Sequence, residues 1–331
     1  MDDYWNGKAV LVTGAAGFIG SHLVEALARR GARVRAYIRY NSSGRRGWLD
    51  DLDPALAGRV EIFAGDVRDY ARTLQAVTGV ECVFHLASLI AIPYSYHAPE
   101  SYVQTNISGG LNVLSAARAA GMVRVVHTST SEVYGTARYV PIDEDHPLQG
   151  QSPYSASKIS ADMLAESFHR SFGLPVAVIR PFNTYGPRQS ARAVIPTILS
   201  QLYAGVREIR LGALTPTRDF NFVADTVEGF LCMGRSEEAV GKVVNIGSGR
   251  EIAIGALVGL LCEITGKRAE IVCDEERLRP AQSEVERLLC DAGLAGRLGW
   301  KPGHTLEQGL EITARWVQAH PEHFRPDLFA L

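Results

Sequence analysis

The chain has 331 residues, a hydrophobic fraction of 46%, a charged fraction of 21% and a formal net charge of −2. These values are typical of a globular protein that is long enough for a large core and two domains. The nearly balanced charge provides no electrostatic footprint for nucleic acid or for an anionic membrane. We therefore expect no nucleic-acid partner and no membrane partner.

The amino-terminal segment and the cysteines indicate a compartment. Residues 1–7 are acidic and lack the basic and apolar regions of a signal peptide, and no apolar run approaches the roughly 20 residues that span a bilayer. Five cysteines are odd in number and form no C-x-x-C pair: Cys82, Cys232, Cys262, Cys273 and Cys290. We expect free thiols in a reducing compartment, no metal site and a cytoplasmic location.

The first half of the chain alternates short β-branched runs with helical patterns. In chain order, the pattern predicts a strand at 8–13, a helix at 18–30, strands at 33–39, 60–63 and 82–86, a helix at 100–120, a strand at 123–128, a helix at 154–172 and a strand at 176–180. Parallel neighbours need crossover connections, so repeated β-α-β order predicts a parallel sheet with helices on both faces. The expected fold class is α/β, a Rossmann-type doubly wound parallel sheet.

Beyond residue 180, prolines and glycines separate shorter elements, as expected of a part built from loops and small helices. Residues 243–246 are predicted to return to the sheet, and a helix at 254–265, a strand at 269–273 and a helix after residue 305 follow. The expected division is a first domain over 1–180, to which 220–250 return, and a smaller, interleaved second domain over 181–331.

A glycine-rich turn joins the first predicted strand to the first helix. Without a Cβ, Gly14 and Gly17 let the backbone approach a pyrophosphate, whose charge is favoured by the helix N-terminus, and Gly20 lets the helix pack closely on the sheet. A glycine triplet alone is a weak signal, but this one follows a strand and opens a helix. It predicts a dinucleotide site that includes Phe18 and Ile19.

The end of the second predicted strand should select between NAD and NADP. An acidic residue there would accept hydrogen bonds from the ribose 2′-hydroxyl of NAD, but residues 35–43 contain no carboxylate. Arg39 with Asn41 and Ser42 suits a 2′-phosphate, so NADP is favoured over NAD. The alternative is that Arg39 is a solvated residue that stacks on the adenine.

Further cofactor contacts are expected where the later strands end, because ligands of open α/β sheets gather there. Asp66 could accept a hydrogen bond from the adenine amino group, whereas His85 lies within an apolar run and is expected to be structural. The remaining expected cofactor contacts are Val67, Leu86, Ala87, Ser88, Thr128 and Pro181.

Tyr154 and Lys158 lie four residues apart on a predicted helix and therefore share one face. A free tyrosine has a pKa near 10, which is too high for an efficient base at neutral pH, and a neighbouring ammonium would lower that pKa. Tyr154 could then take a hydroxyl proton while hydride leaves the same carbon for a nicotinamide. An exposed i,i+4 pair is the alternative, which the position one strand and one helix after residues 128–129 argues against.

These motifs together resemble the extended short-chain dehydrogenase/reductase family, whose members act on nucleotide-sugars. The resemblance covers nearly the whole chain and includes residues 180–188, 218–220 and 245–249. It implies that the first domain binds NADP or NAD, tightly held and recycled, and that the second domain binds an NDP-sugar.

Residues 130–132 discriminate within that family. Sugar 4-epimerases usually carry small residues where this chain has Glu132, whereas 4,6-dehydratases use a carboxylate there to remove the C5 proton of a 4-keto intermediate. Thr130 would bind the 4-hydroxyl beside Tyr154. Many dehydratases have an aspartic acid where this chain has Ser131. The Thr-Ser-Glu sequence at 130–132 is similar to that of GDP-mannose 4,6-dehydratases. The acid for the departing 6-hydroxyl stays open between Ser131, Glu132 acting twice and a relayed water.

Two segments resemble the dehydratases of the legionaminic-acid pathway, namely residues 92–102 and 147–154. The resemblance implies UDP- or GDP-N-acetylglucosamine as substrate and a 4-keto-6-deoxy product. A diphosphate also needs local donors and positive charge. The expected substrate contacts, besides Thr130, are Tyr94, Ser95, Asn183, Arg192, Arg218, Arg279 and Glu284, the last of which could hold the nucleotide ribose.

Three alternatives remain open. A UDP-glucuronate decarboxylase would share Thr-Ser-Glu but needs a late arginine, where this chain has Leu288. A 4-epimerase is disfavoured by Glu132, and a catalytically silent dinucleotide-binding protein is disfavoured by the intact catalytic residues. The family also pairs two helices across a two-fold axis, here 100–120 and 154–172, so a homodimer through a four-helix bundle is expected.

Overall fold

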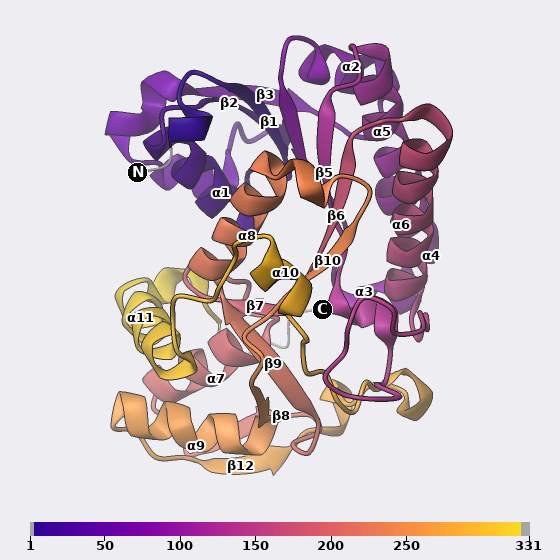
Figure 1. The fold of residues 1–331 in the computed structure, drawn as a ribbon. Coiled ribbons are helices and arrows are strands. Elements are labelled where there is room, and N and C mark those ends of the chain that lie inside the picture. Colours follow the sequence, from indigo (N-terminus) through magenta and orange to yellow (C-terminus); the bar gives the residue numbers. More distant parts are fainter. Residues whose placement is uncertain (1–2, 326–331) are drawn as a thin grey trace.

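The computed structural model describes residues 3–325, which form one large parallel sheet and a smaller second part (Figure 1). The large sheet has the order β10-β6-β5-β4-β1-β2-β3, and every neighbouring pair is parallel. Its strands are β1 (Ala9–Thr13), β2 (Arg33–Arg39), β3 (Val60–Gly65), β4 (Cys82–His85), β5 (Arg124–Thr128), β6 (Val176–Pro181) and β10 (Val243–Ile246). The strand order reverses between β1 and β4, so their carboxyl ends border the crevice where such sheets bind ligands.

Helices cover both faces of this sheet. One apolar core joins the strands to α1 (Phe18–Arg29) and α8 (Val223–Arg235), and a second core on the other face joins them to α2 (Tyr70–Val77), α5 (Gly109–Ala119) and α6 (Pro153–Phe172). Figure 1 shows α2, α5 and α6 side by side on one flank. The predicted doubly wound α/β fold is therefore confirmed, as is the return of 243–246 to the sheet beside β6.

The helix predicted at 100–120 is interrupted. It consists of α4 (Pro99–Tyr102), a π-helical segment at Val103–Ser108 and then α5. Close packing accompanies the change, because a Cβ on Gly109 would lie 2.9 Å from Cγ2 of Val67. Periodicity alone does not distinguish one π-helical turn from continuous α-helix.

The second part has a three-stranded sheet of order β11-β9-β7 and a two-stranded sheet of β8 and β12. Its strands are β7 (Asn183–Tyr185), β8 (Glu208–Leu211), β9 (Thr217–Phe222), β11 (Glu251–Ala253) and β12 (Glu270–Cys273). Its helices α7 (Val194–Tyr203), α9 (Ile254–Thr265) and α11 (Leu306–Ala319) share an apolar core of their own with these strands. The predicted helix at 254–265 and the closing helix are found where the sequence placed them.

Short elements complete the described chain. These are α3 (Ile92–His97), α10 (Gly293–Arg297) and helical turns at Asp3–Trp5, Gly47–Asp51, Pro54–Arg59, Ser131–Tyr134, Glu237–Ala239, Glu275–Arg277, Ala281–Ser283 and Pro321–His323. Within residues 3–325, no helix combines the length and apolar character that crossing a bilayer requires.

Candidate active site

The end of β5 and the start of α6 bring the predicted catalytic residues together. Ser152 caps α6 by accepting from the backbone N–H of Ser155 at 3.1 Å, and the Ser155 hydroxyl accepts from Ser152 N at 2.9 Å. This reciprocal cap fixes the start of the helix, so Tyr154 and Lys158 occupy its first two turns on one face. The Nζ of Lys158 donates to the carbonyl of Thr128 at the end of β5.

Burial determines the protonation of both residues. It raises the pKa of Tyr154 well above its ordinary value, and a hydrogen bond from Thr130 opposes that shift. The sequence-based expectation of a lowered tyrosine pKa is therefore wrong for the protein as described here, because removing the phenolate from water outweighs the nearby ammonium. Burial also lowers the pKa of Lys158 to about 8. Lys158 therefore stays largely protonated at neutral pH.

Glu132 lies in a short helical turn that directly follows the strand end. The Thr130 hydroxyl caps this turn by accepting from Glu132 N at 3.2 Å. The Glu132 carboxylate is one of the charges that raise the pKa of Tyr154, and its Oε2 lies 3.8 Å from Nη1 of Arg279. The side-chain contact of Glu132 is therefore with Arg279, while Ser131 beside it is buried.

Two arginines and a second carboxylate border Glu132. Arg218 on β9 donates to Glu284 Oε1 at 3.1 Å, and Arg279 Nη1 lies 3.8 Å from the same oxygen. Buried Nη1 of Arg279 and Nδ2 of Asn183 have no hydrogen-bond partner among the described residues. Buried donors normally find acceptors, so these two suit an anionic ligand beside the arginines. Glu284, expected to hold a ribose, pairs with Arg218 in this structure.

Other predicted substrate residues are placed differently. Tyr94 on α3 is 42% exposed, whereas Ser95 is fully buried and its hydroxyl donates to the carbonyl of Ile92 within its own helix. Arg192 is exposed and donates to Ser190 at 3.2 Å.

Tyr102 is a site neighbour that sequence reasoning missed. It is fully buried, its hydroxyl donates to the carbonyl of Ala91, and its ring centroid lies 6.2 Å from that of Tyr154. Tyr102 ends the segment 92–102 that resembles other dehydratases, but the sequence pattern predicts no role for it there. Tyr102 therefore packs against Tyr154 in one small buried cluster.

The predicted dinucleotide turn is closely packed. A Cβ on Gly14, which has a φ of 68°, would lie 2.8 Å from Ala87 N, and one on Gly20 would lie 2.2 Å from the carbonyl oxygen of Gly14. Gly17 precedes α1 without any side-chain cap, so Phe18, Ile19 and Gly20 begin the helix at an uncapped end. A glycine cradle at an uncapped helix N-terminus fits a pyrophosphate.

The strand ends beside this turn hold the other predicted cofactor residues. Thr13 Oγ1 accepts from Leu86 N and Ala87 N at the end of β4, and Ser88 follows directly. Pro181 ends β6, beside Ile246 of β10. The Thr128 hydroxyl is buried and has no hydrogen-bond partner within the described chain.

Most of the residues predicted to contact the adenosine half of the cofactor are exposed or bond to neighbours in their own segments. Arg39 is exposed at the end of β2, and Asn41 bonds both backbone groups of Arg45, which closes the loop that contains Ser42. Asp66 forms an ion pair of 2.6 Å with Arg68, and that contact lowers the pKa of the carboxyl. Val67 is buried next to it.

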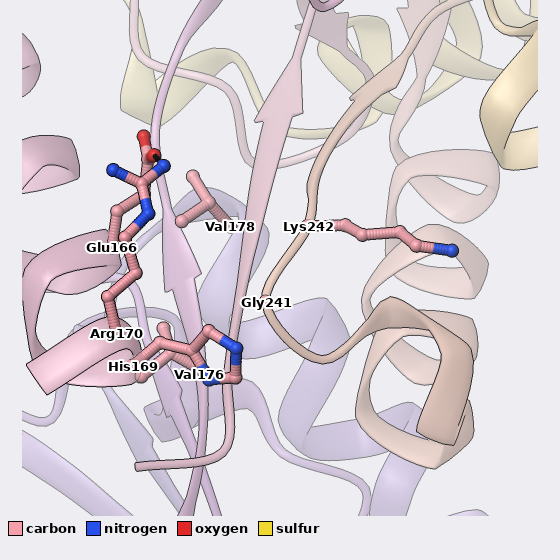
Figure 2. A pocket seen from close by; sticks show the side chains of 7 residues that line it. All are labelled: Glu166, His169, Arg170, Val176, Val178, Gly241 and Lys242. Carbon is pink, nitrogen blue, oxygen red and sulfur yellow. Dashed lines mark hydrogen bonds and ion pairs between the residues drawn. The ribbon is translucent and has the colours of Figure 1, made fainter. Parts of the chain in front are cut away.

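Two cavities lie away from this site. The one in Figure 2 is lined by residues near the end of α6, the start of β6 and the approach to β10: Glu166, His169, Arg170, Val176, Val178, Gly241 and Lys242. The other borders Lys8, Cys82 and Arg124 at the amino ends of β1, β4 and β5. Both are on the opposite edge from the carboxyl strand ends, so neither is the candidate active site.

The parallel sheet, the glycine cradle and the Tyr154–Lys158 pair define an extended short-chain dehydrogenase/reductase. The family model for GDP-mannose 4,6 dehydratase matches residues 11–313. The chain therefore belongs to that family of extended short-chain dehydrogenase/reductases.

Individual relatives agree with this assignment and also include epimerases. A dTDP-glucose 4,6-dehydratase of Streptomyces griseus is 35% identical over 320 residues, 96% of each chain. The dTDP-glucose 4,6-dehydratase DesIV of Streptomyces venezuelae, solved with NAD bound, has a TM-score of 0.85 at 30% identity and covers 96% of this chain and 99% of its own. A UDP-glucose 4-epimerase of Thermotoga maritima, solved with UDP-glucose, has a TM-score of 0.83 at 31% identity and covers 94% and 99%. The NAD of the first structure and the cradle described here support a nicotinamide dinucleotide cofactor.

Proposed function

We propose that this protein is an NDP-sugar 4,6-dehydratase that converts UDP- or GDP-N-acetylglucosamine into a 4-keto-6-deoxy sugar. The observation that carries the proposal is the position of Glu132, whose carboxylate lies 3.8 Å from Arg279 and whose charge helps to raise the pKa of Tyr154. Oxidation or epimerisation at C4 needs the tyrosine and the lysine. Only elimination across C5–C6 needs a further base in the same pocket.

In the proposed mechanism each residue has one task. Thr130 and Tyr154 bind the 4-hydroxyl, and Tyr154 takes its proton when it is in the phenolate form. Burial raises the pKa of Tyr154, and the charged Lys158 one turn away must offset that effect by stabilising the phenolate. The bound nicotinamide supplies a hydride acceptor for C4 and later a hydride donor for C6. Glu132 removes the C5 proton, which the 4-ketone acidifies, and the 6-hydroxyl departs as water. The departing 6-hydroxyl takes its proton from Glu132, Ser131 or a relayed water, and a solvent proton is added at C5 when the hydride reaches C6.

The nucleotide end of the substrate is assigned to the polar cluster in the second domain. Arg218, Arg279 and the unpartnered amide of Asn183 are placed to bind the diphosphate. The exposed Tyr94 lies on the segment that resembles N-acetylglucosamine dehydratases. We assign residues 1–180 with 220–250 to the cofactor and 181–331 to the nucleotide-sugar.

The cofactor is proposed to be NADP, although NAD fits the same glycine cradle. Arg39 is exposed beside the loop at 41–45, where it can reach a 2′-phosphate. Arg45 and Arg46 follow in that loop, so the charge there is positive.

A homodimer is proposed from exposed apolar side chains, and a reducing compartment is proposed from the free cysteines. Helices α5 and α6 and the π-helical segment expose the large apolar side chains of Val103, Leu111, Met163 and Phe172. Pairing of two copies through these helices would cover them. All five cysteines are free, which suits a cytoplasmic location.

The decarboxylase alternative has less support than the dehydratase. Leu288, at the position where a decarboxylase would need arginine, is fully buried in an apolar cluster, and Arg287 forms an ion pair with Glu251 instead. Because 4-epimerases are among the relatives, the 4-epimerase remains an alternative function. Glu132 is the residue that argues against it.

Product analysis tests the proposal. The enzyme is incubated separately with UDP-N-acetylglucosamine, GDP-N-acetylglucosamine and UDP-glucuronate in deuterated water, and the products are examined by NMR. We expect a 4-keto-6-deoxy sugar that carries a solvent deuteron at C5. A 4-epimer, or carbon dioxide released from UDP-glucuronate, would overturn the dehydratase assignment in favour of the corresponding alternative.

A further inference from the structure

A buried ionic cluster lies beneath the Tyr154–Lys158 pair. Asp162 follows Lys158 by one helical turn, so Tyr154, Lys158 and Asp162 share one face of α6 at i, i+4 and i+8. Asp162 is completely buried, and its Oδ2 accepts from the Ser129 hydroxyl at 2.6 Å. Arg180 on β6 donates to the same oxygen from Nε at 3.2 Å and from Nη2 at 3.0 Å.

Three consecutive residues at the end of β5, 128–130, contact this face of α6. The Thr130 side chain interacts with Tyr154 and opposes the rise of its pKa, the Thr128 carbonyl accepts from Lys158, and the Ser129 hydroxyl donates to Asp162. The strand end thus holds the helix in register at three successive turns. Asp162 belongs to the same constellation as the two catalytic candidates, although it is too deep to touch a substrate.

The charges in this cluster do not balance. Groups that carry charge or titrate around Lys158 are Tyr154 and Asp162 on α6, His85 on β4, His127 on β5 and Arg180 on β6. Burial lowers the pKa of both histidines, so they are neutral near pH 7. Burial alone would raise the pKa of Asp162, but its contacts with His127, Arg180 and Ser129 hold it below the ordinary value. Within the described chain, Asp162 is therefore the single buried anion of this cluster, and it compensates the charges of two buried cations, Lys158 and Arg180.

We infer that Asp162 is a positioning residue that keeps the buried Lys158 in its ammonium form, so that the lysine can stabilise the Tyr154 phenolate during catalysis. A fully desolvated ammonium is unfavourable unless an opposite charge lies near, and Asp162 is the buried carboxylate one helical turn from Lys158 on the same face of α6. A purely structural alternative is that Asp162 only anchors Arg180. This inference rests on the proposed role of the Tyr154–Lys158 pair, but its test needs no substrate.

The test measures where Lys158 titrates in the folded protein. Stability against urea is measured from pH 6 to 10 for the full chain and for K158M, and the difference reports the titration of Lys158 alone. Because the pKa of Lys158 is lowered on folding, wild type gains stability relative to K158M as pH rises above the folded-state pKa of about 8. The same pair is then made in a D162N background and in an S129A background.

In the D162N background we expect the gain to begin about 1 pH unit lower or more, because the opposite charge is gone. S129A removes a hydrogen bond from the same carboxylate without changing its charge, and we expect it to leave the onset unmoved. An unmoved onset in D162N, or an equal shift in S129A, would overturn the inference.

Because D162N leaves Arg180 without its carboxylate, it could fail to fold. R180Q then carries the test, since it removes the competing cation and keeps Asp162. The inference expects the onset in R180Q to move to higher pH. An onset that stays in place or moves to lower pH would overturn it, and would support the structural alternative.

Discussion

Nη1 of Arg279 lies 3.8 Å from Oε2 of Glu132, the carboxylate proposed as the base of the elimination. The same nitrogen lies 3.8 Å from Glu284, so one guanidinium faces two carboxylates that come from distant parts of the chain. In the proposed mechanism, Arg279 pairs with the base and also binds the diphosphate, so it would connect the sugar to the nucleotide end of the substrate. Variants at the two carboxylates can therefore separate the two functions.

Glu132→Gln should abolish elimination while oxidation at C4 persists. The amide keeps the shape of the side chain but cannot take the C5 proton, so we expect product formation to fall about 100- to 10,000-fold. The reduced nicotinamide should accumulate when the variant is mixed with UDP- or GDP-N-acetylglucosamine, as measured by its absorbance. Glu284→Gln is the matched control on the other side of Arg279, and we expect it to change KM with elimination intact. Loss of oxidation together with elimination in Glu132→Gln would contradict the assigned role.

Tyr154→Phe should stop the reaction at its first step. Removing the hydroxyl leaves the ring packing but no group to take the proton from the 4-hydroxyl, so we expect turnover to fall about 100- to 10,000-fold. Tyr102→Phe is the control, because Tyr102 is buried beside Tyr154 and its hydroxyl bonds the carbonyl of Ala91. Turnover of both variants is measured alongside their melting temperatures. Equal losses in the two variants would indicate a packing role for Tyr154.

Much of the fold and part of the site could be predicted because their signals are local. Strand and helix periods, the turn at Gly14–Gly20 and the four-residue spacing of Tyr154 and Lys158 are each complete within a short stretch. The structure brings that turn to the end of β4 and that pair to the end of β5, as the order of elements required.

What could not be predicted depends on partners far away in the chain. Asp66 and Arg68 are two residues apart, so their pairing could be predicted from the sequence. Glu284 and Arg218 are 66 residues apart, so their pairing could not. The direction of the pKa shift of Tyr154 depends on how completely it is buried, which spacing does not report. Asp162 was overlooked for the same reason: its partners Ser129 and Arg180 come from two different strands.

Replacing Lys158 by methionine should stabilise the folded protein at neutral pH. The lysine is completely buried with its pKa lowered to about 8, which corresponds to a cost of roughly 3 kcal/mol for keeping it charged in the fold. Below pH 8 that cost is constant, and between pH 8 and the ordinary pKa of lysine it disappears, so the advantage of Lys158→Met should shrink as pH rises. Urea unfolding at pH 7 and pH 10 measures both values. An advantage that grows with pH would show that the lysine pKa is raised instead.

Arg39→Ala should weaken NADP binding more than NAD binding. If Arg39 pairs with the 2′-phosphate, its loss removes a charge-assisted hydrogen bond, and we expect the Kd for NADP to rise about 10-fold while the Kd for NAD changes little. Arg46→Ala is a matched control, because Arg46 lies in the same exposed loop but pairs with Asp50 at 3.0 Å. Calorimetric titration of both dinucleotides into each variant, at one fixed salt concentration, measures the ratio. Equal changes for NADP and NAD in Arg39→Ala would mean that this arginine contacts the adenosine without binding the 2′-phosphate. The proposed preference for NADP would then have no support from β2, because Arg39 is the exposed basic residue at the carboxyl end of that strand.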